Sequence, residues 1–276
     1  MRTISIICTW ARRKQSALPF NGKPPRSERR AVATRLLSQD HGQHDGPGFA
    51  ITRLLCIACL GLVIACALGS KAGASTITWD GGGDGLSWHD PANWSSDTLP
   101  TEVDDVVLAS PAGVLVAFSG DDAIVRRLDL RGGLTVVSGK LEVKETAAVT
   151  GSLVIVGGSF STQTGLNAVG GTLEYNSGTL AGPVTVRNGT LTVGPQGTAA
   201  VDFILQGACA ISGKIGAGQT LRLESSVAYG PMVATAPTGL TNQGTIRLEC
   251  ASDNWKDQSV VLAIAGGVLK NASNGH

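Results

Sequence analysis

The sequence is poor in the residue types on which catalytic sites depend. Histidine occurs four times in 276 residues, and only His89 and His276 lie beyond residue 74. A nucleophile, a base and an orienting group do not occur together in a recognisable pattern. The glycine-rich stretches precede strand patterns and not helices, so no phosphate-binding loop is predicted. We therefore expect neither a nucleotide-dependent enzyme nor any other catalytic activity, and no nucleotide partner.

Paired carboxylates, which polysaccharide hydrolases and lyases use, are scarce as well. Asp121-Asp122 is the one adjacent acidic pair in the repetitive part of the chain, and Asp104-Asp105 follows a tryptophan-rich motif. Neither pair is accompanied by the histidine and arginine motifs of pectin-degrading enzymes. We interpret Asp121-Asp122 as a solvated turn.

Charge is nearly balanced over the whole chain but not along it. Residues 1–53 hold ten Lys or Arg against three Asp or Glu, whereas residues 54–276 hold twelve against eighteen. The acidic balance of the second part argues against binding to nucleic acid or to anionic lipid. The basic part directly precedes an export signal, where a nucleic-acid arm makes no sense. We expect residues 1–50 to be a disordered or mis-assigned N-terminal extension.

The apolar run Leu54–Leu68 is too short for a permanent membrane anchor, because it has fifteen residues where a spanning helix needs roughly twenty. A positive flank precedes it and small residues follow it, so the sequence predicts a signal peptide over 51–74, cleaved between Ala74 and Ser75. The predicted location is extracellular or at the cell surface. An alternative stays open, because residues 63–66 resemble a bacterial lipobox that would make Cys66 a lipidated membrane anchor.

Of the six cysteines, four precede the predicted cleavage site. Cys56 and Cys59 have the spacing of a redox or metal motif, but they lie within the apolar signal segment and are interpreted as part of it. Cys209 and Cys250 remain in a compartment that permits disulfides. Their separation corresponds to about two of the repeats described next, so a bridge between them is possible but not required.

Apolar residues recur at a fixed spacing in the second half of the chain. Leu134, Leu153, Leu173, Leu191 and Ile211 follow one another at intervals of 18 to 20 residues. Each lies in a short segment that alternates apolar and polar residues, which is the period of a half-buried strand. One such repeat is the length of a solenoid coil.

Two later segments, Thr220–Ser225 and Thr245–Cys250, are nearly identical and lie 25 residues apart. Between them the proline-containing stretch Tyr229–Pro237 is predicted as an extra loop, because proline cannot donate to a central ladder. An antiparallel sandwich also has short strands, but its strands need not recur at a fixed phase. The sequence therefore predicts an all-β fold, a right-handed parallel β-helix (β-solenoid) over 111–276.

Residues 75–110 are predicted to form an N-terminal cap on this solenoid. The segment Trp79–Trp94 reads WDGGGDGLSWHDPANW, and Leu99-Pro100 and an Asp-x-Val strand follow it. It resembles the opening motif of large bacterial surface proteins with autotransporter-associated or filamentous-haemagglutinin-like β-repeats, which are frequent in planctomycetes. The resemblance extends over most of residues 76–276 and implies an exported surface protein. Members are usually far longer, so we expect this chain to be a truncated N-terminal fragment.

The tryptophans and aspartates of the motif have two interpretations each. Trp79, Trp88 and Trp94 could stack on sugar rings, but we favour a role in covering the open end of the core. Asp80, Asp84 and Asp90 could bind Ca²⁺, although solvated aspartates in glycine turns are commoner. No other cofactor is predicted.

Two function classes remain. The first is an exported structural or adhesive surface protein whose repeated face makes many weak contacts, with surface or matrix polysaccharide or other surface proteins as partners. The alternative is a polysaccharide-binding or polysaccharide-degrading β-helix module. A groove of exposed aromatic and charged residues along one face would favour the alternative.

Overall fold

The computed structural model describes residues 2–7, 74–250, 259–272 and 275–276, which belong to one compact unit. Their regular structure is almost entirely β, and the helical exception is the short 3-10 helix η1 (Pro91–Asn93). The predicted all-β class is confirmed. Within these ranges no helix has the length and apolarity to cross a membrane. Most of the predicted extension and of the signal segment, including Cys66, lies outside the described residues.

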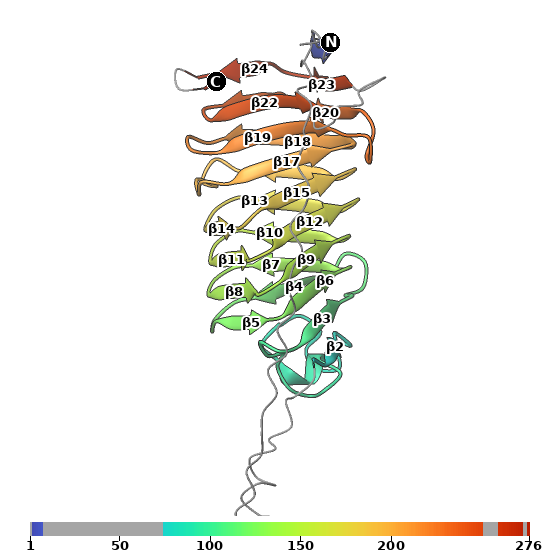
Figure 1. The fold of residues 1–276 in the computed structure, drawn as a ribbon. Coiled ribbons are helices and arrows are strands. Elements are labelled where there is room, and N and C mark those ends of the chain that lie inside the picture. Colours follow the sequence, from blue (N-terminus) through green and yellow to red (C-terminus); the bar gives the residue numbers. More distant parts are fainter. Residues whose placement is uncertain (1, 8–73, 251–258, 273–274) are drawn as a thin grey trace, which may run out of the picture. The chain divides into compact units, whose positions relative to one another are not determined.

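The described strands form three sheets that run along the stack (Figure 1). The nine-stranded sheet has the order β2 (Thr76–Thr78), β3 (Asp105–Leu108), β6 (Arg127–Leu130), β9 (Thr146–Val149), β12 (Gly165–Val169), β15 (Val184–Arg187), β17 (Asp202–Gln206), β19 (Thr220–Ser225) and β22 (Thr245–Cys250).

The four-stranded sheet has the order β14 (Thr179–Ala181), β11 (Ser159–Thr162), β8 (Lys140–Val143) and β5 (Ala123–Val125). The main path of the eleven-stranded sheet is β1 (Arg2–Ile7), β23 (Ser259–Ile264), β20 (Met232–Ala236), β18 (Ala208–Ile215), β16 (Thr190–Val193), β13 (Thr172–Tyr175), β10 (Ser152–Ile155), β7 (Gly133–Val136) and β4 (Leu115–Phe118). To the side of this path β21 (Leu240–Asn242) pairs with β18 and β24 (Leu269–Asn271).

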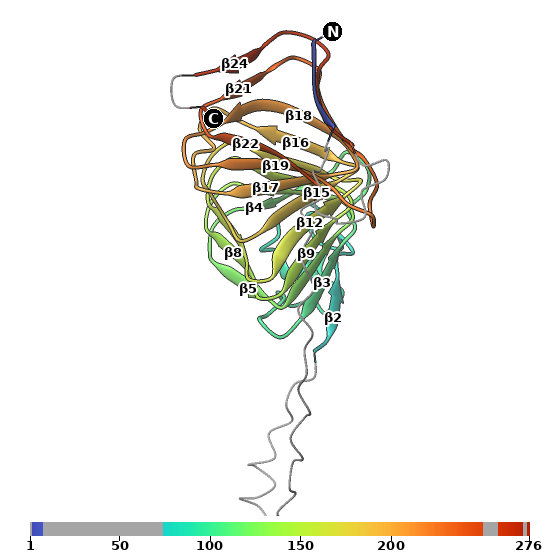
Figure 2. The same cartoon turned by 45° about the horizontal axis from the view of Figure 1, so that its top comes forward.

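Successive strands visit the three sheets in turn, which makes the chain a parallel β-solenoid. β3, β4 and β5 lie on three different sheets, and β6 then returns to pair in parallel with β3. The four-stranded sheet ends at β14, so the later coils alternate mainly between the two larger sheets. Figure 2 shows the stacked coils in an oblique view.

The predicted repeat is confirmed residue by residue. Leu153 lies opposite both Leu134 and Leu173, and Leu191 lies opposite both Leu173 and Ile211. The similar segments in β19 and β22 are also paired in register. Since identical registers bring like side chains together, the interval of 18 to 20 residues reflects one turn of the coil.

The inward positions of the coils form a continuous apolar core. In β10, Leu153 and Ile155 are fully buried while the two alternate residues are partly exposed, and most other strands repeat this pattern. Burial of one such side chain contributes about 2 kcal/mol relative to exposure. A single coil has too few of them to fold alone, so stability arises from stacking.

The predicted loop Tyr229–Pro237 is wrong over most of its length. Met232–Ala236 forms β20, which pairs in parallel with β18 and β23. The prolines flank this strand, and at its ends no ladder hydrogen bond is required of them. Extra residues of this longer coil lie before β20, where Ser226 and Gly230 form an isolated antiparallel bridge.

Candidate functional site: a pocket beside the tryptophan cap

The three tryptophans of the opening motif lie at the end of the core and not on the surface. Trp88 and Trp94 have no exposed surface, and Trp79 is 6% exposed. The Trp94 ring meets Trp79 and Trp88 edge to face, with centroids 5.0 and 4.8 Å apart, and Trp88 meets Phe118 in the same way. The Trp94 Nε1–H donates to the Trp88 carbonyl at 2.8 Å. This geometry is that of a cap, because the ring faces are not free for a sugar.

Asn93 holds the glycine-rich loop of the cap together. It is fully buried, and its Oδ1 accepts from the backbone N–H groups of Gly83 and Gly85. Its Nδ2 donates to the Asp84 carboxylate and to the Ser87 carbonyl. All its polar capacity is therefore used. Sequence reasoning gave Asn93 no structural role, although its place before Trp94 in the motif was a usable signal.

The aspartates considered as Ca²⁺ ligands bond to the backbone of the same loop. Asp80 accepts from Gly82, and Asp90 accepts from the N–H groups of Asp84 and Ala92. Backbone N–H groups of Ser87 and Leu86, with the amide of Asn93, lower the pKa of Asp84. In the described part of the chain, no three His, Cys, Asp or Glu side chains are grouped as a metal site would require.

Asp104 ties the start of the cap to the first coils. It is buried, and its carboxylate accepts from the Ser75 Oγ at 2.5 Å and from the Thr101 N–H and hydroxyl at 2.9 and 2.6 Å. Desolvation raises its pKa, but these hydrogen bonds outweigh that effect and the pKa is lowered. The Ser75 carbonyl also accepts from Asp105 N–H. A chain cleaved between Ala74 and Ser75 would keep these contacts.

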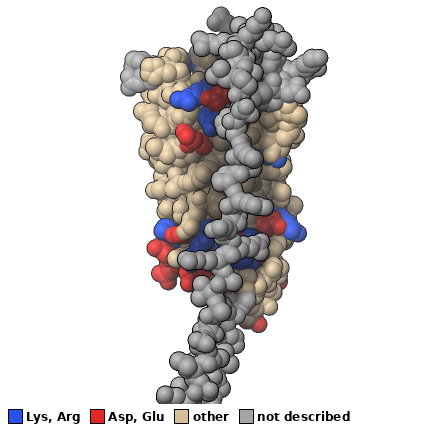
Figure 3. All heavy atoms as spheres, viewed as in Figure 1, with Lys and Arg blue, Asp and Glu red and all other residues tan. Residues whose placement is uncertain are grey.

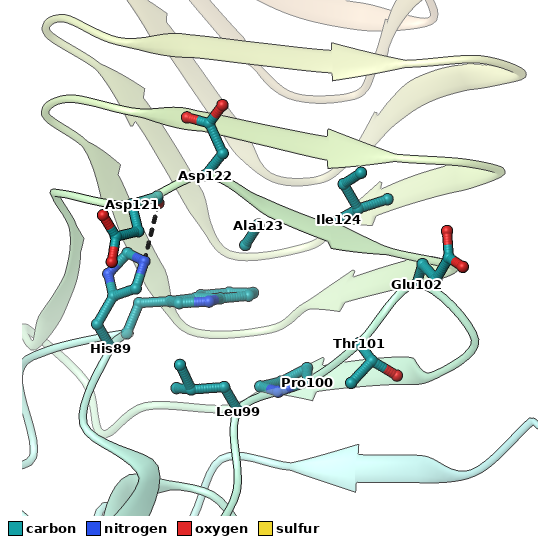
Figure 4. Close-up of a pocket in the computed structure, with 10 residues that line it drawn as sticks. His89, Leu99, Pro100, Thr101, Glu102, Asp121, Asp122, Ala123 and Ile124 are labelled. Atoms are coloured by element: carbon teal, nitrogen blue, oxygen red, sulfur yellow. Dashed lines mark hydrogen bonds between the residues drawn. The ribbon is translucent and has the colours of Figure 1, made fainter.

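A pocket of about 450 Å³ lies between the cap and the coil that contains β5 (Figure 4). One wall is the loop Leu99–Glu102, the other is the segment Asp121–Ile124, and Trp88 and His89 complete the lining. The volume falls within the range of roughly 300–1,000 Å³ found for small-molecule sites. The two walls lie about twenty residues apart in sequence and meet because one coil stacks on the other.

His89 is fixed at one end of this pocket. Its Nε2 is 2.9 Å from the Asp121 carbonyl and donates to it, because a carbonyl can only accept. Its ring packs against Phe118 with centroids 4.9 Å apart. The Nδ1 atom is buried and has no hydrogen-bond partner within the described structure. Nδ1 is therefore an unused polar atom beside an otherwise satisfied cap.

The carboxylates around the pocket differ in what they bind. Asp122 accepts from the Lys140 backbone N–H at 2.8 Å and points away from His89 in Figure 4. Glu102, at the opposite end, is ion-paired with Lys144. Asp121 and Asp122 are both exposed, and Asp121 lies in a bend, as the interpretation of a solvated turn expects. The pocket thus combines an apolar floor with carboxylates at its rim.

Two other surface grooves are less suited to bind a small molecule. A groove of about 640 Å³ follows stacked turns at Gly132, Gly151 and Gly171, and Arg131 is its only charged residue. A smaller one of about 320 Å³ is lined by residues of β3, β6 and β9. Neither contains an aromatic residue.

Many charged side chains on the outside of the coils form ion pairs, some within one strand and some between neighbouring coils. Arg126 pairs with Asp105 at 2.5 Å, and Arg222 with Glu249 at 2.8 Å. Figure 3 shows red and blue side chains together in an upper and a lower group, with a long uncharged stretch between the two groups. The visible part of this face therefore has no continuous strip of one charge, as electrostatic binding to a polyanion would need.

The pairing of Cys209 with Cys250 is wrong. Cys209 is free and buried on β18, where it lies opposite Ala234, whereas Cys250 belongs to β22 of the other large sheet and is disulfide-bonded. Burial raises the pKa of the Cys209 thiol, and its Sγ lies 3.3 Å from the Gln206 carbonyl. The two cysteines are about two coils apart in sequence and lie on different sheets, so they do not face each other.

The chain matches no known family, no curated protein and no solved structure.

Proposed function

We propose that this chain is an exported structural or adhesive β-solenoid of the cell surface or extracellular space, without a catalytic role. The observation that carries the proposal is the buried apolar column from Ile77 to Ile264, which three tryptophans close at its N-terminal end. The polar groups of the cap are used to hold its own loop. The side chains of such a stack maintain a rigid structure, and we propose that they do not form a reaction centre.

The outer face of the stack supports an adhesive role. Thr135, Val154, Glu174, Thr192 and Ser212 succeed one another in register along the eleven-stranded sheet. Short, mostly uncharged side chains therefore recur along the sheet at the spacing of the coils, about 4.8 Å. Such a ladder offers many equivalent weak contacts, which add when several copies are displayed together.

Export is supported by the order of basic, apolar and small residues before Ser75, and by the resemblance of the opening motif to bacterial surface proteins. Expression in a bacterium with sequencing of the exported product tests it. A product that begins at Ser75 is expected. A lipid-modified product that begins at Cys66 would instead establish a lipoprotein, and retention of the full chain in the cytoplasm would contradict export.

Adhesion is tested by comparing the free chain with the chain coupled densely to beads, on surfaces coated with bacterial exopolysaccharides or with outer-surface protein. Beads should adhere and the free chain should not, because single contacts are weak. Beads coated with heat-unfolded chain are the control. Equal retention of the free and the coupled chain would contradict multivalent adhesion. If the beads do not adhere, the adhesive role is excluded and only the structural role remains.

Polysaccharide recognition is a second candidate, and the pocket beside the cap favours it. The carboxylate-bearing residues Asp121 and Glu102 line this pocket together with the apolar residues Leu99 and Ile124. A sugar unit presents both hydroxyls and an apolar face, which is the chemistry of this lining.

Calorimetric titration with oligosaccharides distinguishes the candidates. If the pocket recognises sugar, binding by the full chain is lost in Ile124→Glu and retained in the matched surface variant Val137→Glu, since both residues are about 40% exposed but only Ile124 lines the pocket. Equal binding by both variants would exclude the pocket.

A further inference from the structure

One edge of the four-stranded sheet borders the pocket beside the cap. Among the described strands, β5 pairs with β8 on one side and with no strand on the other, where the loop Leu99–Glu102 faces it across the pocket. Figure 4 shows Leu99 and Pro100 on one wall and Ala123 and Ile124 on the opposite wall. The pocket therefore lies along a strand edge in the interior of the stack.

Ile124 carries the free hydrogen-bonding groups of this edge. The Val125 carbonyl accepts from the Lys144 N–H of the next coil at 2.9 Å, so Val125 directs its backbone groups to β8. Because neighbouring residues of a strand point their backbone groups to opposite sides, the N–H and C=O of Ile124 point away from β8. Within the described residues, neither group has a hydrogen-bond partner. One donor and one acceptor of the same residue therefore remain unpaired on the side of the pocket.

The lining adds apolar surface and negative charge to these two groups. Ile124 is 39% exposed and Leu99 is 36% exposed, so both have apolar surface that a ligand can cover. Asp121 and Asp122 line the pocket and form no ion pair with any described residue. Among the described residues, no Lys or Arg lines the pocket. An anionic ligand would therefore enter without a compensating cation.

We propose that this pocket binds one uncharged sugar unit through two adjacent hydroxyls and discriminates against acidic sugars. The N–H and C=O of an extended residue lie side by side, as do two adjacent hydroxyls of a pyranose ring. A hydroxyl both donates and accepts, so one hydroxyl oxygen accepts from the Ile124 N–H while its neighbour donates to the Ile124 carbonyl. The apolar face of the ring covers Leu99. Asp121 and Asp122 repel a uronate or a sulfate ester, because like charges brought together disfavour the wrong partner.

An added peptide strand fits this edge less well. In β-strand addition, an extended peptide pairs with several residues along an edge. Here Ala123 and Val125 direct their backbone groups to β8, and the Arg126 N–H donates to the Asp104 carbonyl at 2.9 Å. Of the residues of β5, Ile124 alone directs both groups to the pocket. One donor beside one acceptor suits a pair of hydroxyls and not a continuous ladder.

This inference rests on the polysaccharide recognition given above as the second candidate function, and it names the class of sugar. Calorimetric titration of the full chain compares β-1,4-linked tetramers of glucose and of mannose with their uronic acid counterparts, which differ by a carboxylate at C6. At low ionic strength a neutral tetramer should bind at least about tenfold more tightly than its uronate counterpart, and added salt should narrow the difference by screening. The 2,3-di-O-methyl derivative should not bind, because methylation removes the adjacent hydroxyl donors.

Two substitutions test the two halves of the proposal. Ile124→Pro removes the free donor without removing a ladder hydrogen bond, and should weaken binding of the neutral tetramer about tenfold. Ile124→Val keeps the N–H and should bind more tightly than the proline variant. Asp121→Asn should raise the affinity for the uronate tetramers several-fold, whereas Asp202→Asn, at an exposed position of β17 outside the pocket, should not. Urea unfolding checks that each variant is folded.

The outcomes separate this inference from sugar recognition itself. Equal affinity for neutral and acidic tetramers, undiminished binding of the methylated derivative, or a folded proline variant that binds as the valine variant does would each overturn the inference and leave sugar recognition in place. If neither neutral tetramer binds, both are overturned. Binding of a blocked tetraalanine peptide in place of the sugars would show strand addition and would also overturn the inference. The comparison of methylated and unmethylated tetramers needs no variant, so it decides the hydroxyl contact even if the proline variant does not fold.

Discussion

Replacement of Trp94 by alanine should remove much of the stability of the N-terminal end. The side chain is fully buried, contacts two other tryptophans edge to face, and donates a hydrogen bond to the Trp88 carbonyl. Truncation of a buried tryptophan to alanine costs about 3–5 kcal/mol. We expect a loss of about 4 kcal/mol in the free energy of unfolding, because the rigid rings of Trp79 and Trp88 border the space and can fill it only in part.

Urea unfolding followed by far-UV circular dichroism measures this loss without relying on tryptophan fluorescence. Trp94→Phe keeps most of the ring but removes the donor, so it should lose about 1–2 kcal/mol, the cost of an unpaired buried carbonyl, plus a smaller packing cost. Leu86→Ala is the matched control from the same motif, since Leu86 is 56% exposed and should change stability by less than about 0.5 kcal/mol. A loss below about 1 kcal/mol for Trp94→Ala would refute the cap.

Three further predictions concern other parts of the molecule. The pKa of Asp104 is lowered in the folded chain, so its contribution to stability is complete above the ordinary carboxyl pKa and is lost as pH falls through the lowered value. Asp104→Asn should therefore flatten the decline of the urea midpoint between pH 6 and pH 3, and an unchanged slope would contradict this assignment. Cys209, buried with a raised pKa, should react with a thiol reagent only on unfolding, and rapid labelling of the native chain at this residue would show that the site is open. Gly213→Ala should cost several kcal/mol, because φ is +96° and a Cβ would lie 1.9 Å from the Val193 carbonyl oxygen. Gly113→Ala, with φ +84° and nothing within 4 Å, should cost only about 1 kcal/mol, so equal unfolding midpoints for the two variants would contradict the close approach of the coils.

The solenoid was predictable because its signal is local and repeated. Leu153 and Leu173 share a residue type, a flanking glycine and a phase, and parallel stacking turns that phase directly into a register. The closure of the core by Trp88 and Trp94 was also predictable, since large aromatic residues before the first repeat have nowhere else to be buried. Each of these inferences needs only the order of residues along one coil.

Features that depend on contacts between coils could not be predicted in this way. Met232–Ala236 was expected to be a loop, because the flanking prolines were taken to exclude a strand that they in fact bound. A bridge between Cys209 and Cys250 was left open, because coil length indicates height in the stack but does not identify the sheet on which each cysteine lies. The pocket walls, Leu99–Glu102 and Asp121–Ile124, meet only once the coils are stacked.

Residues 2–7 show the same limit most clearly. Their alternation of apolar and polar residues is visible in the sequence, but they were grouped with an extension expected to be disordered or mis-assigned. Their partner, β23, lies more than 250 residues away. A six-residue strand has no local signal that distinguishes it from a disordered segment when the edge that accepts it is not known.

The proposed function depends most on the inference that the tryptophans close a structural column and do not recognise sugar. A glycan array probed with the purified chain and with Trp79→Ala, Trp88→Ala and Trp94→Ala, each checked by circular dichroism, tests it most directly. If the tryptophans form a cap, the substitutions lower stability and remove no specific glycan signal. Specific glycan binding that disappears in a tryptophan variant with an unchanged fold would contradict it.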